Sequence, residues 1–130
     1  MTYLKSFIVL ILVLLISGNV NAQSSANKLL EKRFAGAWVN KKSRRHLEIY
    51  FEDGYATIMD WTAKFQQRES SDVYKAFPQN GKLVMPEETE HHAPYSEIVF
   101  ENNRLIYLTK VSQNSKTITW DSIVFTRSPK

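Results

Sequence analysis

Alternation of apolar and polar side chains defines the clearest element of the chain. In the stretch HLEIYFE, which begins at residue 46, every second residue is apolar: Leu47, Ile49 and Phe51. A period of two is that of a β-strand with one buried face. Asp53-Gly54 follows, and this dipeptide favours a two-residue hairpin turn because both central positions of such a turn need positive φ. The pattern therefore predicts a strand that turns back into the next one.

The rest of the chain after Gly36 repeats this order of short strand and turn. Turns are indicated by Asn80-Gly81, by Asn102-Asn103 and by the QNSK stretch at 113–116. The other predicted strands are residues 37–40, 55–65, 73–77, 82–86, 95–101, 104–111 and 117–127. Short strands at regular spacing are typical of an antiparallel meander that closes into a barrel. We therefore predict an all-β fold, a small antiparallel meander barrel of seven or eight strands.

One short helix is predicted before the strands. In the stretch ANKLLEKRF, the side chains of Leu29, Leu30 and Phe34 fall roughly on one side of a helix of about two turns. Ser24 or Ser25 can cap its first turn, because a serine hydroxyl accepts a hydrogen bond from an unpaired N–H there. The helix leads directly into the first strand.

The first 22 residues are typical of an export signal. Lys5 supplies a positive charge, residues 7–16 an apolar core, and Val20-Asn21-Ala22 a cleavage site of small residues. The apolar core is well short of the roughly 20 residues that span a bilayer, so we expect a cleaved signal peptide and no transmembrane anchor. Residues 23–130 then form a single domain. An exported chain without cysteine fits a bacterial periplasm or the cell exterior.

The stretch Phe34-Ala35-Gly36-Ala37-Trp38 resembles the F-x-G-x-W signature of the calycin group, the lipocalins and fatty-acid-binding proteins. In that group a short helical turn precedes the first strand, the tryptophan packs over the closed end of the barrel, and an arginine of the last strand lies across its indole. Arg127, in IVFTR, stands at the matching place. The resemblance implies a lipocalin-like barrel that Gly36, Trp38 and Arg127 close.

The chain also departs from the calycin pattern. It is shorter than typical lipocalins, lacks the helical pair of fatty-acid-binding proteins, and has no match to the second lipocalin motif around Thr-Asp-Tyr. A short barrel can fill its interior with side chains instead of holding a ligand. A hollow and a filled barrel therefore both remain open.

Basic and aromatic residues provide the candidates for ligand binding. The run KKSRRH lies between the first two strands, a connection that often covers the open mouth of a calycin barrel. Its bases can attract a carboxylated lipid or another anion, or they form an ordinary solvated loop. Aromatic residues on the strands line a cavity, pack in the core, or form the self-association surface of a homodimer. The candidate ligand-binding residues are Lys41, Lys42, Arg44, Arg45, Trp61, Tyr74, Tyr107 and Trp120.

The loop PEETEHHAP, residues 86–94, has the most unusual composition of the chain. If it is extended, Glu88, Glu90 and His92 share one face and His91 points away. Carboxylates and imidazoles can ligate a divalent metal. No His-Glu-x-x-His spacing accompanies them, so we expect no resident metal or cofactor. The other interpretation is a solvated acidic loop.

The charge and the motifs exclude several functions. The formal net charge is +4, but residues 23–46 hold seven basic groups and one acidic group, whereas residues 87–101 hold five acidic groups and no basic one. These segments can meet charged partners or simply be solvated. Nucleic acid is not expected, because we expect the protein to be exported and its basic run has no interleaved aromatic residues. No Gly-x-Ser-x-Gly motif, phosphate loop or cysteine indicates an enzyme. An enzyme would have to use Asp60, Asp121 or His91.

The sequence therefore predicts an exported β-barrel that binds an apolar or amphipathic small molecule. The alternative is a barrel with a solid core that acts as a protein-interaction or inhibitor module through its exposed loops.

Overall fold

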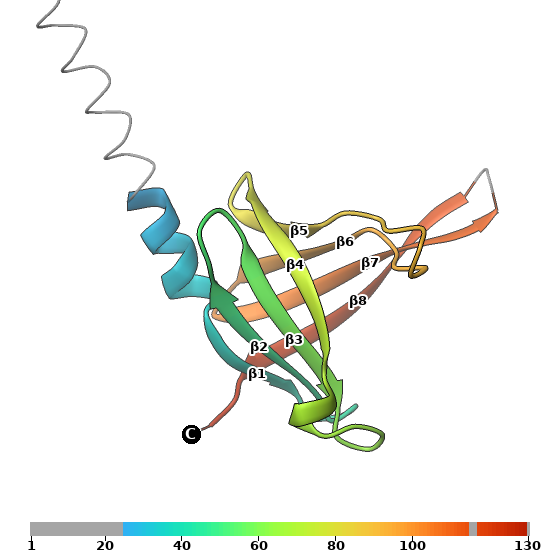
Figure 1. Ribbon diagram of the computed structural model, residues 1–130, viewed down its shortest axis with the longest axis horizontal. Helices are drawn as coiled ribbons and strands as arrows, with labels where there is room; N and C mark the ends of the chain where they lie inside the picture. The colour runs from blue at the N-terminus through green and yellow to red at the C-terminus, as the bar shows by residue number, and fades with distance from the viewer. Residues whose placement is uncertain (1–24, 115–116, 130) are drawn as a thin grey trace, which may run out of the picture.

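Eight antiparallel strands close into a barrel in the computed structural model, which describes residues 25–114 and 117–129 (Figure 1). Each strand pairs with the next in the chain, and the last pairs with the first. The strands are β1 (Gly36–Asn40), β2 (Arg45–Phe51), β3 (Ala56–Thr62), β4 (Asp72–Gln79), β5 (Lys82–Met85), β6 (Ser96–Glu101), β7 (Arg104–Asn114) and β8 (Thr117–Arg127). The predicted all-β barrel is confirmed. The predicted signal peptide (1–22), the cap at Ser24 and part of the QNSK turn lie outside the described residues.

A helix of residues 25–34 precedes β1, and a short 3-10 turn, η1 (Arg68–Ser70), lies between β3 and β4. The helix is somewhat longer than the two turns expected. Its contact with the barrel is made by Phe34, which is fully buried, and by Leu30, which is partly buried against the core. Leu29, on the expected apolar side, is exposed. The helix therefore covers one end of the barrel.

The tight turns use the residues that the sequence indicated. Asn80 and Gly81 both have positive φ (51° and 78°), as do Asn102 and Asn103 (53° and 60°). Asparagine and glycine tolerate this left-handed conformation better than other residues. The turn at Asp53-Gly54 differs, because only Gly54 has positive φ, at 85°. These turns fix the order of the strands around the barrel.

The barrel interior is filled with side chains at the end that the helix covers, which we call the closed end. Phe34 enters this end, with its ring centroid 6.1 Å from that of Phe100. The Trp38 indole packs against the same ring at 6.5 Å and donates a hydrogen bond to the Phe34 carbonyl (2.9 Å). Other fully buried residues of this core are Leu47, Ala56, Ile58, Ala76, Leu83, Ile98, Leu105 and Phe125.

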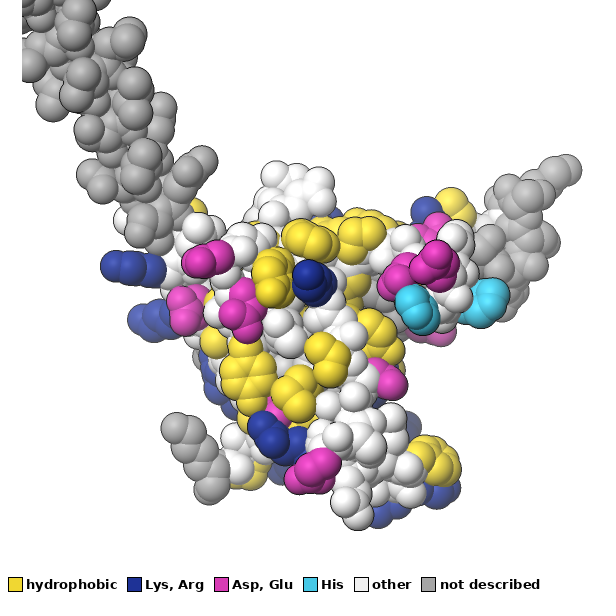
Figure 2. Space-filling view, viewed as in Figure 1, with side chains coloured by type: hydrophobic (Ala, Val, Ile, Leu, Met, Phe, Trp, Pro, Cys, Tyr) yellow, Lys and Arg dark blue, Asp and Glu magenta, His cyan; other side chains and the backbone are white. Residues whose placement is uncertain are grey.

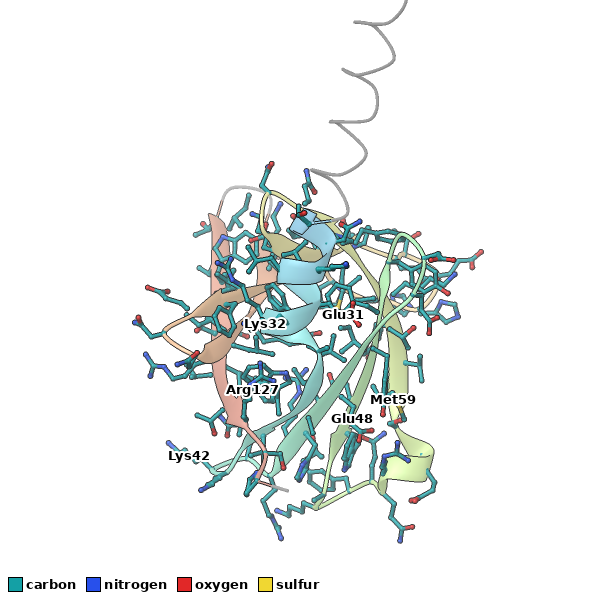
Figure 3. All side chains as sticks on the ribbon, turned by 90° about the vertical axis from the view of Figure 1, so that its left-hand side faces the viewer. Glu31, Lys32, Lys42, Glu48, Met59 and Arg127 are labelled. Atoms are coloured by element: carbon teal, nitrogen blue, oxygen red, sulfur yellow. The ribbon has the colours of Figure 1, made fainter. Side chains whose placement is uncertain are left out.

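Arg127 joins the two ends of the chain at the seam between β1 and β8. Arg127 pairs with Trp38 in the β1–β8 register, and its guanidinium carbon lies 4.3 Å from the centroid of the Trp38 ring. The guanidinium also donates hydrogen bonds to the carbonyls of Lys32, Arg33 and Ala35, at 2.9 to 3.1 Å. The last carbonyls of a helix lack partners within the helix. Arg127 supplies those partners from the far end of the sequence (Figure 3).

Candidate ligand-binding cleft

A cleft of about 920 Å³ enters the barrel between the first half of β4 and the loop of residues 86–94. It forms because β4 and β5 pair only from Phe77↔Val84 to Gln79↔Lys82. The first half of β4 has no partner on β5, since β5 ends at Met85 and the chain leaves the sheet at Pro86. Figure 2 shows apolar side chains across the middle of this face, with acidic and histidine side chains beside them. Below we call its inner end the floor and its outer residues the rim.

An ion pair between Arg45 and Asp60 forms part of the floor. Arg45 donates from Nε to Oδ1 (2.9 Å) and from Nη2 to Oδ2 (2.6 Å) of Asp60. The side chains are 22% and 10% exposed. Two parallel hydrogen bonds offset much of the cost of taking both charges out of water. Burial alone lowers the pKa of the Arg45 guanidinium, but the hydrogen bonds and charge of Asp60 raise it above its usual value.

Strand periodicity explains why these two charges face inward. Arg45 lies on β2 two positions before Leu47, which is fully buried, and Asp60 lies on β3 two positions after Ile58, which is also fully buried. Residues two apart on a strand share a face. The Arg45 guanidinium also lies over the ring of Tyr107, with its carbon 4.6 Å from the centroid. The aromatic ring therefore holds the pair from a third strand.

Two tyrosines add neutral hydroxyl groups to the cleft. Tyr107 is 6% exposed, and its hydroxyl donates to the sulfur of Met85 at 3.7 Å. Burial, with a contribution from the charge of Asp60, raises the pKa of Tyr107 to about 12. Burial and the charges of Asp72 and Asp60 also raise the pKa of Tyr74. Both hydroxyls therefore stay protonated at neutral pH. That of Tyr107 donates to Met85, whereas that of Tyr74 can donate to a ligand. Among the described residues, no group is hydrogen-bonded to the Tyr74 hydroxyl.

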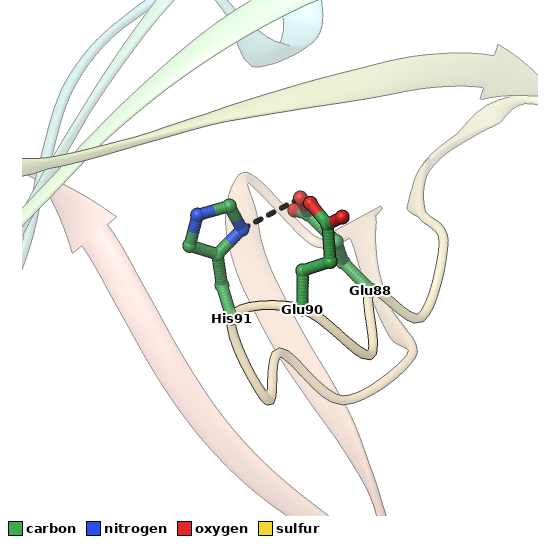
Figure 4. A group of neighbouring side chains, drawn as sticks. All are labelled: Glu88, Glu90 and His91. Carbon is green, nitrogen blue, oxygen red and sulfur yellow. Dashed lines mark hydrogen bonds and ion pairs between the residues drawn. The ribbon is translucent and has the colours of Figure 1, made fainter.

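The loop of residues 86–94 supplies much of the rim, and it turns back on itself rather than running extended. Glu88 and Ala93 exchange two backbone hydrogen bonds of 2.9 Å, and His92 has a φ of 54°. The turn brings His91, and not His92, to the glutamates. His91 Nδ1 lies 2.7 Å from Glu88 Oε1 (Figure 4).

Glu88, Glu90 and His91 each offer one ligand atom within 4.8 Å of the others, and all three are exposed. The expected set with His92 assumed an extended backbone, which the turn excludes. Such exposed groups by themselves assign no metal. Glu88 and His91 line the cleft, and the carboxylate of Glu88 places negative charge on its rim.

The structure brings three of the predicted ligand-binding residues to the cleft: Arg45, Tyr74 and Tyr107. Lys41, Lys42 and Arg44 are exposed in the connection between β1 and β2 and do not line it. Figure 3 shows Lys42 at the end of the barrel away from the helix. The basic connection therefore lies outside the cleft, although Arg45 directly follows it.

The two predicted tryptophans lie on the outer surface of the barrel. Trp61 follows the inward-facing Asp60, so it points outward, where its ring stacks on that of His46 at 5.0 Å. Trp120 lies on the face of β8 opposite to that of the buried Phe125, and it is 45% exposed. Its ring meets that of Tyr95 edge-on at 6.1 Å. Neither tryptophan lines the cleft.

Sequence reasoning did not nominate several residues of the cleft for ligand binding, among them Asp60, Asp72, Met85, Ser96 and Thr109. The period-two pattern of β3 could have identified Asp60 as an inward-facing acid. Met85 and Ser96 lie on either side of the 86–94 loop, and their position depends on where that loop leaves the sheet. No local pattern of residues indicates this.

The residues considered for catalysis do not form one group. Asp60 is paired with Arg45, and His91 lies on the exposed rim. Asp121 is exposed on β8 and does not line the cleft.

A smaller groove of about 400 Å³ lies between the helix and the connection from β2 to β3, where Glu31, Glu52 and Asp53 make it acidic.

No helix among the described residues is long and apolar enough to cross a membrane. Comparison of the chain with family models, with curated proteins and with solved structures gave no match.

Proposed function

We propose that the protein is an exported β-barrel that binds an apolar or amphipathic small molecule in the cleft between β4 and the 86–94 loop. The observation that carries the proposal is the size of the cleft, about 920 Å³, together with its reach into the barrel. Ligand sites in proteins are typically concave and enclose about 300–1,000 Å³. The resemblance of Phe34, Gly36, Trp38 and Arg127 to the calycin signature belongs to the same proposal.

The chemistry of the lining supports an amphipathic ligand. Met85, Pro86 and Pro94 offer apolar contact, whereas Tyr74 and Tyr107 offer hydroxyl groups deeper in the cleft. Ligand sites commonly combine a mostly apolar lining with a few polar groups that set orientation. A molecule with an apolar body and a polar group can satisfy both parts.

The division of the barrel into a filled end and a cleft also supports binding over a solid-core module. The core at the closed end includes Phe34 and Trp38, and none of its fully buried large side chains lines the cleft. The core therefore packs at the closed end without filling the cleft, which its members Met85 and Tyr107 line. This leaves the cleft open for a ligand.

A substitution that fills the cleft tests the proposal. Thr109 lines it from β7, so Thr109→Trp should block it. Thr57→Trp, on the outward-facing side of β3, is the matched control, since its neighbours Ala56 and Ile58 are the buried ones. The measurement is the titration of each variant with a fluorescent amphiphile. We expect the parent and Thr57→Trp to bind it and Thr109→Trp to lose at least about tenfold in affinity. Equal binding by both variants would place the ligand elsewhere and overturn the proposal.

A further inference from the structure

The charged side chains of the cleft are predominantly acidic. Its acidic residues outnumber its lysine and arginine residues by four to two. The acids are Asp60, Asp72, Glu87 and Glu88, and the bases are Arg45 and Lys75. A cleft lined by one sign of charge concentrates ligands of the opposite sign, because its walls of low dielectric focus the field. Whether this excess acts on a ligand depends on how each base is already engaged.

The guanidinium of Arg45 is paired with the carboxylate of Asp60. Its Nε and Nη2 both donate to that carboxylate, at 2.9 and 2.6 Å, and its flat face lies on Tyr107. An anionic ligand that approached the guanidinium would meet the Asp60 charge beside it. The pair therefore acts as a polar but electrically balanced part of the floor.

The side chain of Lys75 lies on the outer face of β4. It lies on β4 between Tyr74 and Ala76, which face the interior, so its side chain points outward. Its Nζ lies 4.7 Å from the ring centroid of Tyr55, a cation–π contact. The ammonium is therefore held beside an aromatic ring outside the cleft.

Two acidic groups of the rim have no such partner. Within the described part of the chain, neither Asp72 nor Glu87 forms an ion pair, and both line the cleft from opposite sides. Among the described residues, the only ionic partner of the Glu88 carboxylate is the imidazole of His91. The rise in the pKa of Tyr74, caused by burial and then by the charges of Asp72 and Asp60, agrees with a negative potential inside the cleft.

We infer that the ligand of this cleft is a cationic amphiphile, whose positively charged group lies near Asp72 and Glu87 and whose apolar body packs against Met85 and Pro94. The inference rests on the proposed function. An amine or quaternary ammonium group also gains from the Tyr74 ring, whose face is not covered by Arg45 as that of Tyr107 is. The basic connection at Lys41 and Lys42 does not counter this, because it does not line the cleft.

Three probes of equal chain length and different charge test the inference: decyltrimethylammonium, decanoate and decanol. Binding is measured by calorimetry, below the micelle-forming concentration of the two ionic probes and below the solubility limit of decanol. We expect the cationic probe to bind at least about tenfold more tightly than decanoate, and the difference to shrink as salt is added. Tighter binding of decanoate, or equal affinities for all three, overturns the inference and leaves the proposed function standing. Binding of none of them overturns both.

A pair of double variants locates the charge effect. Asp72→Asn with Glu87→Gln removes two negative charges from the rim, and Asp53→Asn with Glu101→Gln removes two from exposed positions that do not line the cleft. We expect the first variant to lose the preference for the cationic probe by about three- to tenfold and to keep its affinity for decanol. The second should keep both. An equal loss in the two variants would mean that net charge alone attracts the probe, and would overturn the inference.

Discussion

The guanidinium of Arg127 lies over the indole of Trp38, 4.3 Å from the ring centroid, and so links the last strand to the first. The same group donates to three carbonyls at the end of the helix, which include Lys32 and Ala35. One side chain therefore holds three segments together: helix, β1 and β8. The β1–β8 register has two pairs, Trp38↔Arg127 and Val39↔Thr126, and hydrogen bonds from Ser128 N–H to the Ala37 carbonyl and from Asn40 Nδ2 to the Val124 carbonyl extend it.

Replacing Arg127 by alanine should therefore destabilise the fold. The cation–π contact and the hydrogen bonds of a charged donor to carbonyls together suggest a loss of about 1–3 kcal/mol in the free energy of unfolding, moderated by the exposure of the guanidinium. Urea denaturation measures it. Arg104→Ala, at an exposed position at the start of β7, is the control and should cost less than about 0.5 kcal/mol. Equal effects of the two substitutions would show that the seam does not depend on Arg127.

Gly36→Ala should also destabilise the protein, for two reasons. Gly36 has a φ of 115°, a conformation that residues with a Cβ rarely adopt, and an added Cβ would lie 3.3 Å from Arg127 Nη1. We expect a loss of about 1–3 kcal/mol by denaturation. Gly54→Ala, where φ is 85° and nothing lies within 4 Å of the added Cβ, measures the backbone effect alone. If the contact matters, Gly36→Ala costs less in an Arg127→Ala background, and an unchanged cost would contradict that coupling.

Asp60→Asn should leave the Arg45 guanidinium in the cleft without its ionic partner. Breaking a partly buried ion pair costs more than breaking an exposed one, so we expect a loss of about 1–3 kcal/mol. The control is Glu48→Gln, which breaks the pair with Arg68 on the outer surface (2.8 Å) and should cost less than about 1 kcal/mol. Asp60→Asn should also raise the affinity for decanoate, because the guanidinium is then free to meet an anion. If the affinity for decanoate does not rise, the conclusion that Asp60 neutralises the charge of Arg45 in the cleft is contradicted.

Tyr107 should weaken the fold at alkaline pH. Its pKa is about 12 in the folded protein, mainly through burial, against 10.0 for an unperturbed tyrosine. Between these values the unfolded chain loses the proton first, so the free energy of unfolding falls as pH rises. At about pH 11 the loss due to Tyr107 should be about 1.4 kcal/mol relative to neutral pH. Denaturation of the parent and of Tyr107→Phe at both pH values measures it. The variant should lack this part of the loss, and identical pH dependence would show that Tyr107 is not buried.

The order of the strands could be predicted from the sequence because it depends on local chemistry. The alternation of Leu47 and Ile49 with polar residues marks β2, and the Asn80-Gly81 turn marks the hairpin that follows β4. Trp61 and Trp120 could not be placed, because β3 and β8 carry large apolar side chains on both faces. Only the pairing with neighbouring strands decides which face is inside.

The cleft itself could not be predicted, because it depends on where pairing stops. β4 continues past its last partner on β5, and the loop after Pro86 turns back through the Glu88–Ala93 bridge. That bridge also decides that His91, and not His92, meets Glu88. Both features arise from contacts between segments rather than from the residues of one segment.

The methyl groups of Met59 and Met85 offer the most direct test of the central claim, that a small molecule binds inside the barrel. Met85 lines the cleft, whereas Met59 lies on the outer surface of β3 beside Glu48 (Figure 3). The measurement is the NMR spectrum of ¹³C-methyl-methionine protein, titrated with whichever of the three probes binds most tightly. We predict that the Met85 signal shifts with a saturable dependence on the probe and shows nuclear Overhauser contacts to it, while the Met59 signal stays in place. A probe that shifts Met59 and leaves Met85 unchanged would contradict the claim.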